Sequence, residues 1–290
     1  MKQVAEKLKG PLALIVTLLI TTTVCSQKPA IDWVNIPAGT FTMGSPTDEV
    51  GRDADETRHQ VTLSAFRMSK QEITVAQYKT FIDATGYVTD ADKGTGGFGG
   101  SLVHKGTKFE NKPGVNWKCD VNGKPRPIKD YNHPVIHVSW NDANAFAEWM
   151  GCRLPSEAQW EFACRAGTTT EFGTGNNLTT SEANYNGNYP HHIHPKGEYR
   201  EKTMPVGSFA PNAYGLYDMH GNVWEWCSDG YGEYSSETKT DPEGPESLVH
   251  HIYRGGSWFN DARYCRSAYR SNDNPVNHDS TLGFRLVSIH

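Results

Sequence analysis

Arg254-Gly255-Gly256-Ser257-Trp258 opens the stretch that decides the fold, and Gly283-Phe284-Arg285-Leu286 closes it. Between these two motifs stand Ala262, Arg263, Cys265, Arg266, Ser267, Ala268, Arg270 and Pro275. The positions between them carry mostly Asn, Asp, Tyr, Ser and His. Arg266, Arg270 and Arg285 predict charge-assisted hydrogen bonds that hold loops through carbonyl and carboxylate groups. The glycine pair permits a turn that other residues would strain.

The composition indicates a globular chain that is rich in loops. Its 290 residues suffice for one large domain or two small ones. Gly, Asn and Pro are frequent, so turns should be abundant, and eight Trp and thirteen Tyr offer a core of scattered aromatics. The net charge is slightly negative and no long basic run exists, so we do not expect nucleic acid as a partner.

The N-terminus predicts export. Lys2, Lys7 and Lys9 precede an apolar run from Pro11 to Val24 that is too short and too rich in threonine for a good membrane-spanning helix. We therefore read residues 1–25 as a signal peptide. Cys25 follows at once, before polar residues, which is typical of a bacterial lipoprotein with a diacylglyceryl group on that sulfur. Val24 stands where the usual lipobox has a small residue, so simple cleavage nearby and an uncleaved anchor helix stay as alternatives.

A short tether, residues 26–31, leads into one predicted domain over residues 32–290. Alternating patterns predict strands over residues 32–36, 40–43 and 60–68, and apolar residues at helical spacing predict helices over residues 75–85 and 141–150. Ser156 and Gln159 form a capping box that begins a third helix, which should end at Gly167. Few helices should follow. The expected fold class is α+β with low regular secondary structure.

The cysteines and histidines give weak signals. Five cysteines follow Cys25, an odd number, so at least one thiol should be unpaired: Cys119, Cys152, Cys164, Cys227 and Cys265. No CxxC spacing is present, which argues against a zinc site of the cysteine type. His191, His192 and His194 lie together, and we expect a solvated loop there. A metal site would need a carboxylate or a further histidine close in space.

Several long motifs resemble one family along nearly the whole chain. They are Ile36-Pro37-Ala38-Gly39-Thr40-Phe41-Thr42-Met43-Gly44-Ser45, Glu72-Ile73-Thr74, Val138-Ser139-Trp140-Asn141-Asp142, Arg153-Leu154-Pro155-Ser156-Glu157-Ala158-Gln159-Trp160-Glu161-Phe162, Gly215-Leu216-Tyr217-Asp218-Met219 and Gly221-Asn222-Val223-Trp224-Glu225-Trp226, with the motifs that flank the C-terminal stretch. The chain thereby resembles the formylglycine-generating enzymes, or sulfatase-modifying factors. The resemblance implies a single large domain related to C-type lectins.

The resemblance also implies an oxidase chemistry that this chain departs from. The family's enzymes oxidise a sulfatase cysteine to formylglycine with O2 and a copper ion held by two thiolates, as soft Cu(I) prefers. The corresponding positions here are Asn260 and Cys265. Asn260 cannot supply a thiolate, so tight copper binding is not expected. Cys265 remains the one candidate catalytic residue if the chain is an oxidase after all.

Two calcium sites are implied in the same way. The first would use the side chains of Asp218 and Glu225 and the backbone carbonyls of Gly221 and Val223, hard oxygen ligands that suit Ca²⁺. A hydrogen-bonded turn without metal is the alternative. A second, weaker site would involve the residues Asn184, Tyr185 and Glu198.

The residues after Trp258 contain no Trp, Gln, Met, Lys or Glu. The same lectin-like fold resembles the variable proteins of diversity-generating retroelements, including lipoproteins of the Treponema type. In those proteins, randomising the adenines of Asn codons excludes these five residue types. An undiversified tail that is simply rich in loops explains the pattern as well, and both interpretations stay open. Diversified side chains on a rigid scaffold would form a binding face, with Tyr and Phe as large contact residues. The candidates are Phe259, Asn260, Asp261, Tyr264, Tyr269, Ser271, Asp273, Val276 and His278.

Three functions therefore compete. The first is an exported, lipid-anchored binding protein of the cell envelope whose C-terminal face, residues 259–282, contacts an unknown protein or surface ligand. The second is an oxidase that converts a protein cysteine to formylglycine. The third is a structural envelope component. The copper ligand set discriminates between the first two.

Overall fold

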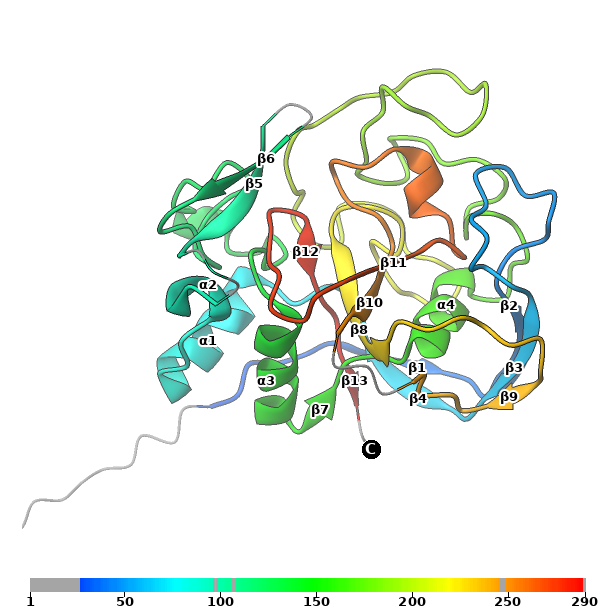
Figure 1. The fold of residues 1–290 in the computed structure, drawn as a ribbon, viewed down its shortest axis with the longest axis horizontal. Helices are drawn as coiled ribbons and strands as arrows, with labels where there is room; N and C mark the ends of the chain where they lie inside the picture. Colours follow the sequence, from blue (N-terminus) through cyan, green and yellow to red (C-terminus); the bar gives the residue numbers. More distant parts are fainter. Residues whose placement is uncertain (1–26, 96, 98, 106–107, 246–248, 289–290) are drawn as a thin grey trace, which may run out of the picture.

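The computed structural model describes residues 27–95, 97, 99–105, 108–245 and 249–288 (Figure 1). The predicted signal peptide and Cys25 lie outside these residues, as does the first residue of the tether. Among the described helices, none combines the length and the apolar composition that a membrane crossing requires.

Two four-stranded sheets form the centre of the fold. The first has the order β1-β4-β13-β7, with β1 at Trp33–Ile36, β4 at Phe66–Ser69, β13 at Val287–Ser288 and β7 at Cys152–Arg153. The second has the order β11-β10-β8-β12, with β11 at Arg270–Asp273, β10 at His251–Arg254, β8 at Trp224–Gly230 and β12 at Leu282–Gly283. Strand β12 pairs with β8 in parallel, whereas the other pairs of both sheets are antiparallel. Both sheets thus recruit residues from the end of the chain.

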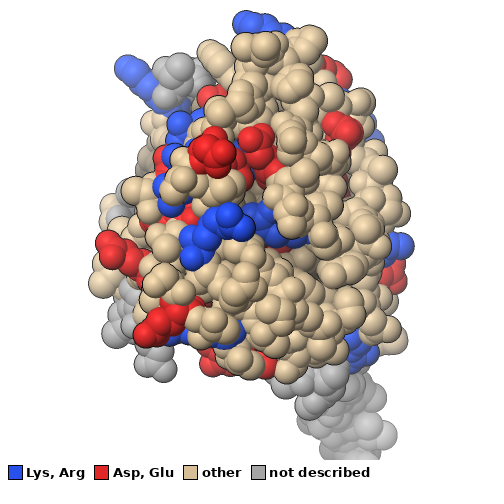
Figure 2. Space-filling view, turned by 90° about the vertical axis from the view of Figure 1, so that its right-hand side faces the viewer, with Lys and Arg blue, Asp and Glu red and all other residues tan. Residues whose placement is uncertain are grey.

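Two smaller units flank this centre. Strands β2 (Gly39–Met43), β3 (His59–Leu63) and β9 (Lys239–Thr240) make a sheet at one edge of the molecule, and that side carries basic and acidic side chains in mixed groups (Figure 2). Strands β5 (Ser101–Lys105) and β6 (Lys108–Lys112) pair as an antiparallel ribbon, which lies above α1 (Val75–Thr85) and α2 (Asp90–Lys93) in Figure 1. The sequence patterns did not predict this ribbon.

The predicted strand over residues 60–68 is wrong as one element. The chain breaks at Ser64 and divides into β3 and β4, which belong to different sheets. The carboxylate of Asp241 accepts hydrogen bonds from the Ser64 backbone N–H, at 2.8 Å, and from its hydroxyl, at 2.7 Å. Because this distant side chain satisfies the Ser64 amide, the ladder ends there.

Local capping signals place the three long helices. These are α1 (Val75–Thr85), α3 (Trp140–Met150) and α4 (Glu157–Arg165), and each begins with a capping box from Thr74, Ser139 or Ser156. The predicted starts and ends agree with the structure within about two residues. The short helices were not predicted: α2 (Asp90–Lys93) and the 3₁₀ helices η1 (Ile128–Asp130) and η2 (Ala262–Cys265). In the described part after α4, η2 is the single helix, as expected.

Four buried arginines, Arg254, Arg266, Arg270 and Arg285, tie the C-terminal stretch to the rest of the chain, and we call them the arginine frame. Arg254 ion-pairs with Glu161 of α4, and Arg270 makes two bonds of 2.8 and 2.7 Å to Glu157. Arg285 binds Glu225 of β8 in the same way, at 2.6 and 2.7 Å. The guanidinium groups also donate to backbone carbonyls, as Arg254 does to Ala268 and Tyr269. This confirms that framework arginines hold the loops.

Arg266 makes the most distant connection of the frame. It donates to both oxygens of Glu56, at 2.9 and 2.7 Å, to Glu49 at 2.5 Å and to the carbonyl oxygen of Gly51 at 2.7 Å. Burial alone would raise the pKa of Glu56, but the Arg266 guanidinium overrides this effect and holds that pKa below its usual value. Arg266 therefore fixes the loop of residues 44–58 at three of its residues, Glu49, Gly51 and Glu56.

We predict that Arg266→Ala lowers the free energy of unfolding by about 3–5 kcal/mol near neutral pH, because it leaves two buried carboxylates uncompensated. Glu56 has a depressed pKa, so its contribution is present above its unfolded pKa and is lost as pH falls through the folded one. The difference between wild type and variant should thus be smaller at about pH 3.5 than at about pH 7. Urea unfolding at both pH values measures it.

Arg263→Ala is the matched control three residues away. Arg263 is 41% exposed and pairs with Asp53, itself 45% exposed, at 3.4 Å. Exposed pairs contribute little, so this variant should lose no more than about 1 kcal/mol. Equal losses for Arg263→Ala and Arg266→Ala would contradict a special role of the buried frame.

Candidate functional site

A pocket of about 240 Å³ opens where the second sheet, of order β11-β10-β8-β12, meets the loops of the C-terminal stretch. All four strands of this sheet contribute, with Trp224 from β8, Tyr253 from β10, Ser271 from β11 and Leu282 from β12. The loop between β10 and β11 adds Phe259, Asn260, Tyr264 and Tyr269, and the lining is completed by His104, Phe109, Asp279 and Thr281. The structure thus brings together five of the nine predicted binding residues: Phe259, Asn260, Tyr264, Tyr269 and Ser271.

Aromatic rings make one wall of this pocket. His104 of β5 lies between Phe109 of β6, at 3.9 Å between ring centroids, and Phe259, at 3.7 Å. Burial lowers the pKa of His104 to about 4, so its ring is neutral at neutral pH. Tyr264 meets Tyr269 edge to face at 4.9 Å. The ribbon residues were missed because no pattern links residues 101–112 with residue 259.

The expectation of an exposed binding face is wrong for two of the nine residues. Tyr269 is only 9% exposed and packs against Trp224, and His278 is 2% exposed with Nδ1 3.1 Å from the hydroxyl of Ser101. The other seven are partly buried. Tyr269 therefore lines the pocket with one part of its ring and packs in the hydrophobic core with the rest.

Asp261, Asp273, Val276 and His278 do not line the pocket. Asp261 precedes η2, and Asp273 accepts hydrogen bonds from the Asn274 backbone and the Asn277 side chain, at 2.8 and 2.6 Å. Val276 donates its backbone N–H to Asn274. Residues 273–277 therefore form a turn that is stabilised by its own side chains.

The positions of the family's copper ligands do not form a thiolate pair here. The side-chain oxygen of Asn260 lies 2.5 Å from the hydroxyl of Ser257. Cys265 is fully buried beneath Gly256, and a Cβ on that glycine would come within 2.5 Å of its sulfur. Burial raises the pKa of the Cys265 thiol, with Asp261 and Cys164 adding to the effect. One amide and one protonated thiol do not fit Cu(I).

At the first predicted calcium site, the carboxylate beside Asp218 that remains available is Glu72 and not the expected Glu225. Both oxygens of Glu225 are taken by Arg285, and one also accepts from the Trp160 indole N–H at 2.7 Å. Instead, Glu72 comes close to Asp218, and each keeps one buried oxygen without a hydrogen-bond partner. Burial raises the pKa of Asp218 to about 6, and it raises the pKa of Glu72 as well, with the charge of Asp218 adding to the effect. Two half-satisfied buried carboxylates fit a hard cation.

The backbone that follows Asp218 is irregular. Asp218, Gly221 and Asn222 all have left-handed backbone angles, with φ of 57°, 82° and 64°. The loop is anchored by a bond from the Asn222 N–H to the Asn184 carbonyl. Glu72 belongs to a quoted family motif, but sequence reasoning had no means to place it beside Asp218.

The residues of the second predicted calcium site are only partly assembled. Asn184 and Tyr185 are each 1% exposed, and the side-chain oxygen of Asn184 is buried without a hydrogen-bond partner. The Tyr185 hydroxyl donates to the carbonyl of Leu178. Glu198 is exposed and pairs with Arg200 at 3.1 Å.

The histidine cluster departs from the expected solvated loop at one residue. His192 and His194 are exposed, but His191 is buried and has a carboxylate beside it, from Glu171. All five cysteines in the described part of the chain are unpaired and buried.

Comparison with known proteins agrees with this architecture. Residues 21–289 match the family described as the sulfatase-modifying factor enzyme 1-like domain. The chain is 37% identical to the formylglycine-generating enzyme of Mus musculus over 284 residues, which cover 89% of this chain and 75% of that protein. It is 33% identical to inactive C-alpha-formylglycine-generating enzyme 2 of Mus musculus over 291 residues, covering 91% and 87%.

Solved structures share the fold. PvdO from Pseudomonas aeruginosa matches with a TM-score of 0.69 and 28% identity, over 90% of this chain and 95% of that one. Treponema denticola variable protein 1 matches with a TM-score of 0.61 and 23% identity, over 88% and 94%. From its matched residues and its fold, the chain belongs to the sulfatase-modifying factor enzyme 1-like family and has the C-type-lectin-like fold of the formylglycine-generating enzymes.

Proposed function

We propose that this chain is an exported binding protein that holds a polypeptide ligand in the pocket between β5, β6 and the C-terminal face. The observation that carries the proposal is that five residues singled out from the C-terminal stretch line one aromatic pocket. The pocket, at about 240 Å³, is smaller than drug-sized ligand sites of roughly 300–1,000 Å³. It therefore suits one protruding side chain better than a whole cofactor.

The lining favours a ligand that is partly apolar. Phe109, Phe259 and Tyr264 offer rigid aromatic surface at low entropy cost, and Asn260 and Ser271 offer hydrogen bonds. Asp279 lies at the same pocket, but its carboxylate accepts hydrogen bonds from the backbone and hydroxyl of Thr281. An aromatic or long aliphatic side chain with one polar atom would satisfy this arrangement.

The donor set at Asn260 and Cys265 argues against the oxidase. One relative is named inactive C-alpha-formylglycine-generating enzyme 2, so membership of the family does not require the activity. A structural envelope component, the third hypothesis, has no specific feature in its favour.

Export and anchoring belong to the same proposal. The lysines before the apolar run and Cys25 after it support a lipid anchor that would display the domain at the bacterial surface. Membrane fractionation of a Cys25→Ala variant tests it, because the anchor idea fails if the variant partitions like wild type. Whether the C-terminal tail is diversified is a separate question, which the neighbouring DNA decides. A nearby reverse-transcriptase gene with an adenine-rich copy of the tail codons would favour diversification, and its absence would favour a tail that is simply rich in loops.

The two pocket tyrosines should differ in their effect on stability. Tyr269→Ala should cost about 3 kcal/mol, because this buried ring packs on Trp224. Tyr264→Ala should cost only about 1 kcal/mol, because its ring is partly exposed. Chemical denaturation of both variants measures the difference. If both variants lost about 3 kcal/mol or more, Tyr264 would be part of the hydrophobic core and not of a binding surface.

Binding itself can be tested with a random peptide library displayed on phage and selected on the purified wild-type chain. Enriched peptides should lose at least about tenfold affinity on Tyr264→Ala and Asn260→Ala, as removal of about 1.4 kcal/mol would produce. They should bind unchanged to Ile128→Ala, which alters an exposed side chain outside the pocket. No enrichment, or equal binding to all variants, would refute the proposal. Conversion of a sulfatase-type peptide cysteine to formylglycine with Cu(I), abolished by Cys265→Ser, would restore the oxidase instead.

We propose further that calcium binds at Asp218 and Glu72, with carbonyl oxygens of the loop at Gly221 and Val223 completing the ligands. The support is the pair of buried carboxylate oxygens without hydrogen-bond partners. The ion would supply positive charge beside Glu72, whose pKa is raised by burial and, in addition, by the charge of Asp218.

Calcium should raise the melting temperature, because it binds the folded chain. The effect should be larger at about pH 7.5 than at about pH 5, since the raised pKa of Asp218 lets protons compete with the ion at the lower pH. In the calcium-free chain the stability changes with pH in the opposite direction. Because the pKa of Asp218 is raised on folding, the folded chain loses stability as pH rises towards that pKa. Melting curves with calcium or EDTA, for wild type and Asp218→Asn/Glu72→Gln, measure both effects. Identical curves with calcium and with EDTA would exclude the site.

A further inference from the structure

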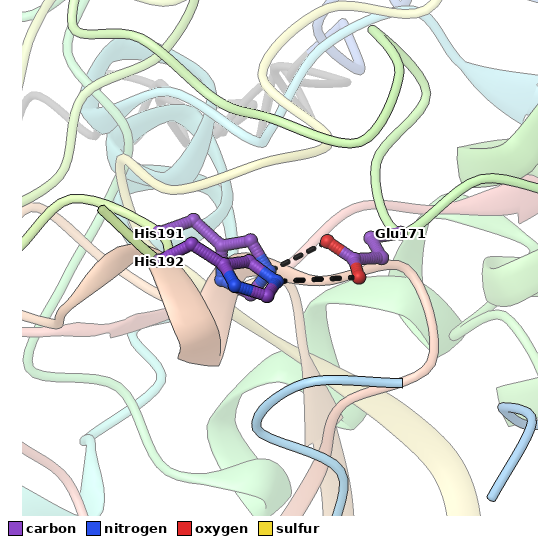
Figure 3. A group of neighbouring side chains, drawn as sticks. All are labelled: Glu171, His191 and His192. Carbon is purple, nitrogen blue, oxygen red and sulfur yellow. Dashed lines mark ion pairs between the residues drawn. The ribbon is translucent and has the colours of Figure 1, made fainter. Parts of the chain in front are cut away.

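We propose that Glu171, His191 and His192 form a binding site for Zn²⁺, separate from the pocket and from the calcium loop. These three side chains are the one group of His, Cys, Asp or Glu ligands, among the described residues, whose potential ligand atoms all lie within 4.8 Å of one another. Figure 3 shows both imidazole rings directed at the Glu171 carboxylate. Two imidazole nitrogens and one carboxylate oxygen are ligands that Zn²⁺ accepts in proteins, with a fourth position left for water.

The spacing of the ligand atoms suits a metal. Nε2 of His191 lies 2.6 Å from one Glu171 oxygen, and Nε2 of His192 lies 3.8 Å from the other. Ligands at about 2.0–2.1 Å from a tetrahedral ion stand about 3.3 Å apart, between these two values. Small rotations of the side chains would therefore place all three around one ion.

Nε2 of His191 and the nearer Glu171 oxygen are both buried, and apart from their 2.6 Å contact with each other neither has a hydrogen-bond partner. Buried polar atoms are almost always satisfied, so these two depend on each other alone. A cation bound by both atoms would use the lone pair that each directs at the other. His191 is 2% exposed, so bulk water cannot replace that ion at its nitrogen.

The backbone explains how two adjacent histidines can reach one ion. In an extended chain, neighbouring side chains point to opposite sides. His192 has a left-handed backbone angle, with φ of 52°, and the two rings come to lie 4.5 Å apart and perpendicular to each other. A non-glycine residue in this region is uncommon, and here it brings both rings to the same side.

Metal binding would join two loops that are each hydrogen-bonded to the C-terminal stretch. The carbonyl of Glu171 accepts from the Ser267 N–H, and the carbonyl of Tyr189, two residues before His191, accepts from the Ala262 N–H. The Asn186 N–H donates to the carbonyl of Asn260, a pocket residue. An ion at Glu171, His191 and His192 would thus fix the loop of residues 186–194 against the segment that presents the pocket.

The test uses the untagged chain, stripped with a chelator and kept in excess calcium so that oxygen-only sites are filled. Isothermal titration should give one Zn²⁺ per chain, and Co²⁺ should give the visible absorption of a nitrogen- and oxygen-ligated ion. His192→Ala should bind more than about 100-fold more weakly, since even the loss of an outer-shell partner costs about 10–100-fold. Glu171→Gln should be weakened as well.

His194→Ala is the matched control, because His194 is exposed and lies in the same loop outside the cluster. It should bind Zn²⁺ like wild type. His192 is itself partly exposed, so its loss should leave the fold intact, and circular dichroism checks this. Absence of stoichiometric binding by wild type, or equal affinity of wild type and His192→Ala, would overturn the site. Neither result depends on the peptide ligand of the pocket.

Discussion

The structure depends on guanidinium–glutamate pairs that are closed to water. Arg254, Arg266, Arg270 and Arg285 meet Glu161, Glu56, Glu157 and Glu225, across sequence separations of 60 to 210 residues. Since a buried charge without its partner is costly, neither side of a pair can take its place in the folded chain alone. Planar guanidinium groups also restrict direction, because each must meet carboxylate and carbonyl oxygens at once. Chain segments without helix or strand thereby gain a defined position.

Local signals in the sequence were sufficient for part of the fold. The capping boxes at Thr74, Ser139 and Ser156 involve residues three apart, so the helix starts could be predicted. Strand order could not, because it depends on pairings such as that of β8 with β12, far apart in the chain. The break at Ser64 shows the same limit, since its cause is a carboxylate 177 residues away.

The candidate sites show the same division between local and distant information. Five pocket residues lie on one continuous segment, so a pattern in that segment was enough to single them out. His104 and Glu72 escaped notice because their partners, Phe259 and Asp218, are remote in sequence. The histidine cluster was seen, but the carboxylate that it needed for a metal, Glu171, lies on another loop. Burial of Tyr269 was equally invisible, because residue type alone does not separate a pocket wall from a core.

The position of β13 has a consequence for biogenesis. Val287 and Ser288 lie between β4 and β7 and pair with both, so the first sheet is incomplete until these two residues are made. A ribosome releases the chain from its N-terminus onwards, and every earlier length would leave two strand edges open and prone to mispairing. The first sheet can therefore close only after residues 287–288 have been made.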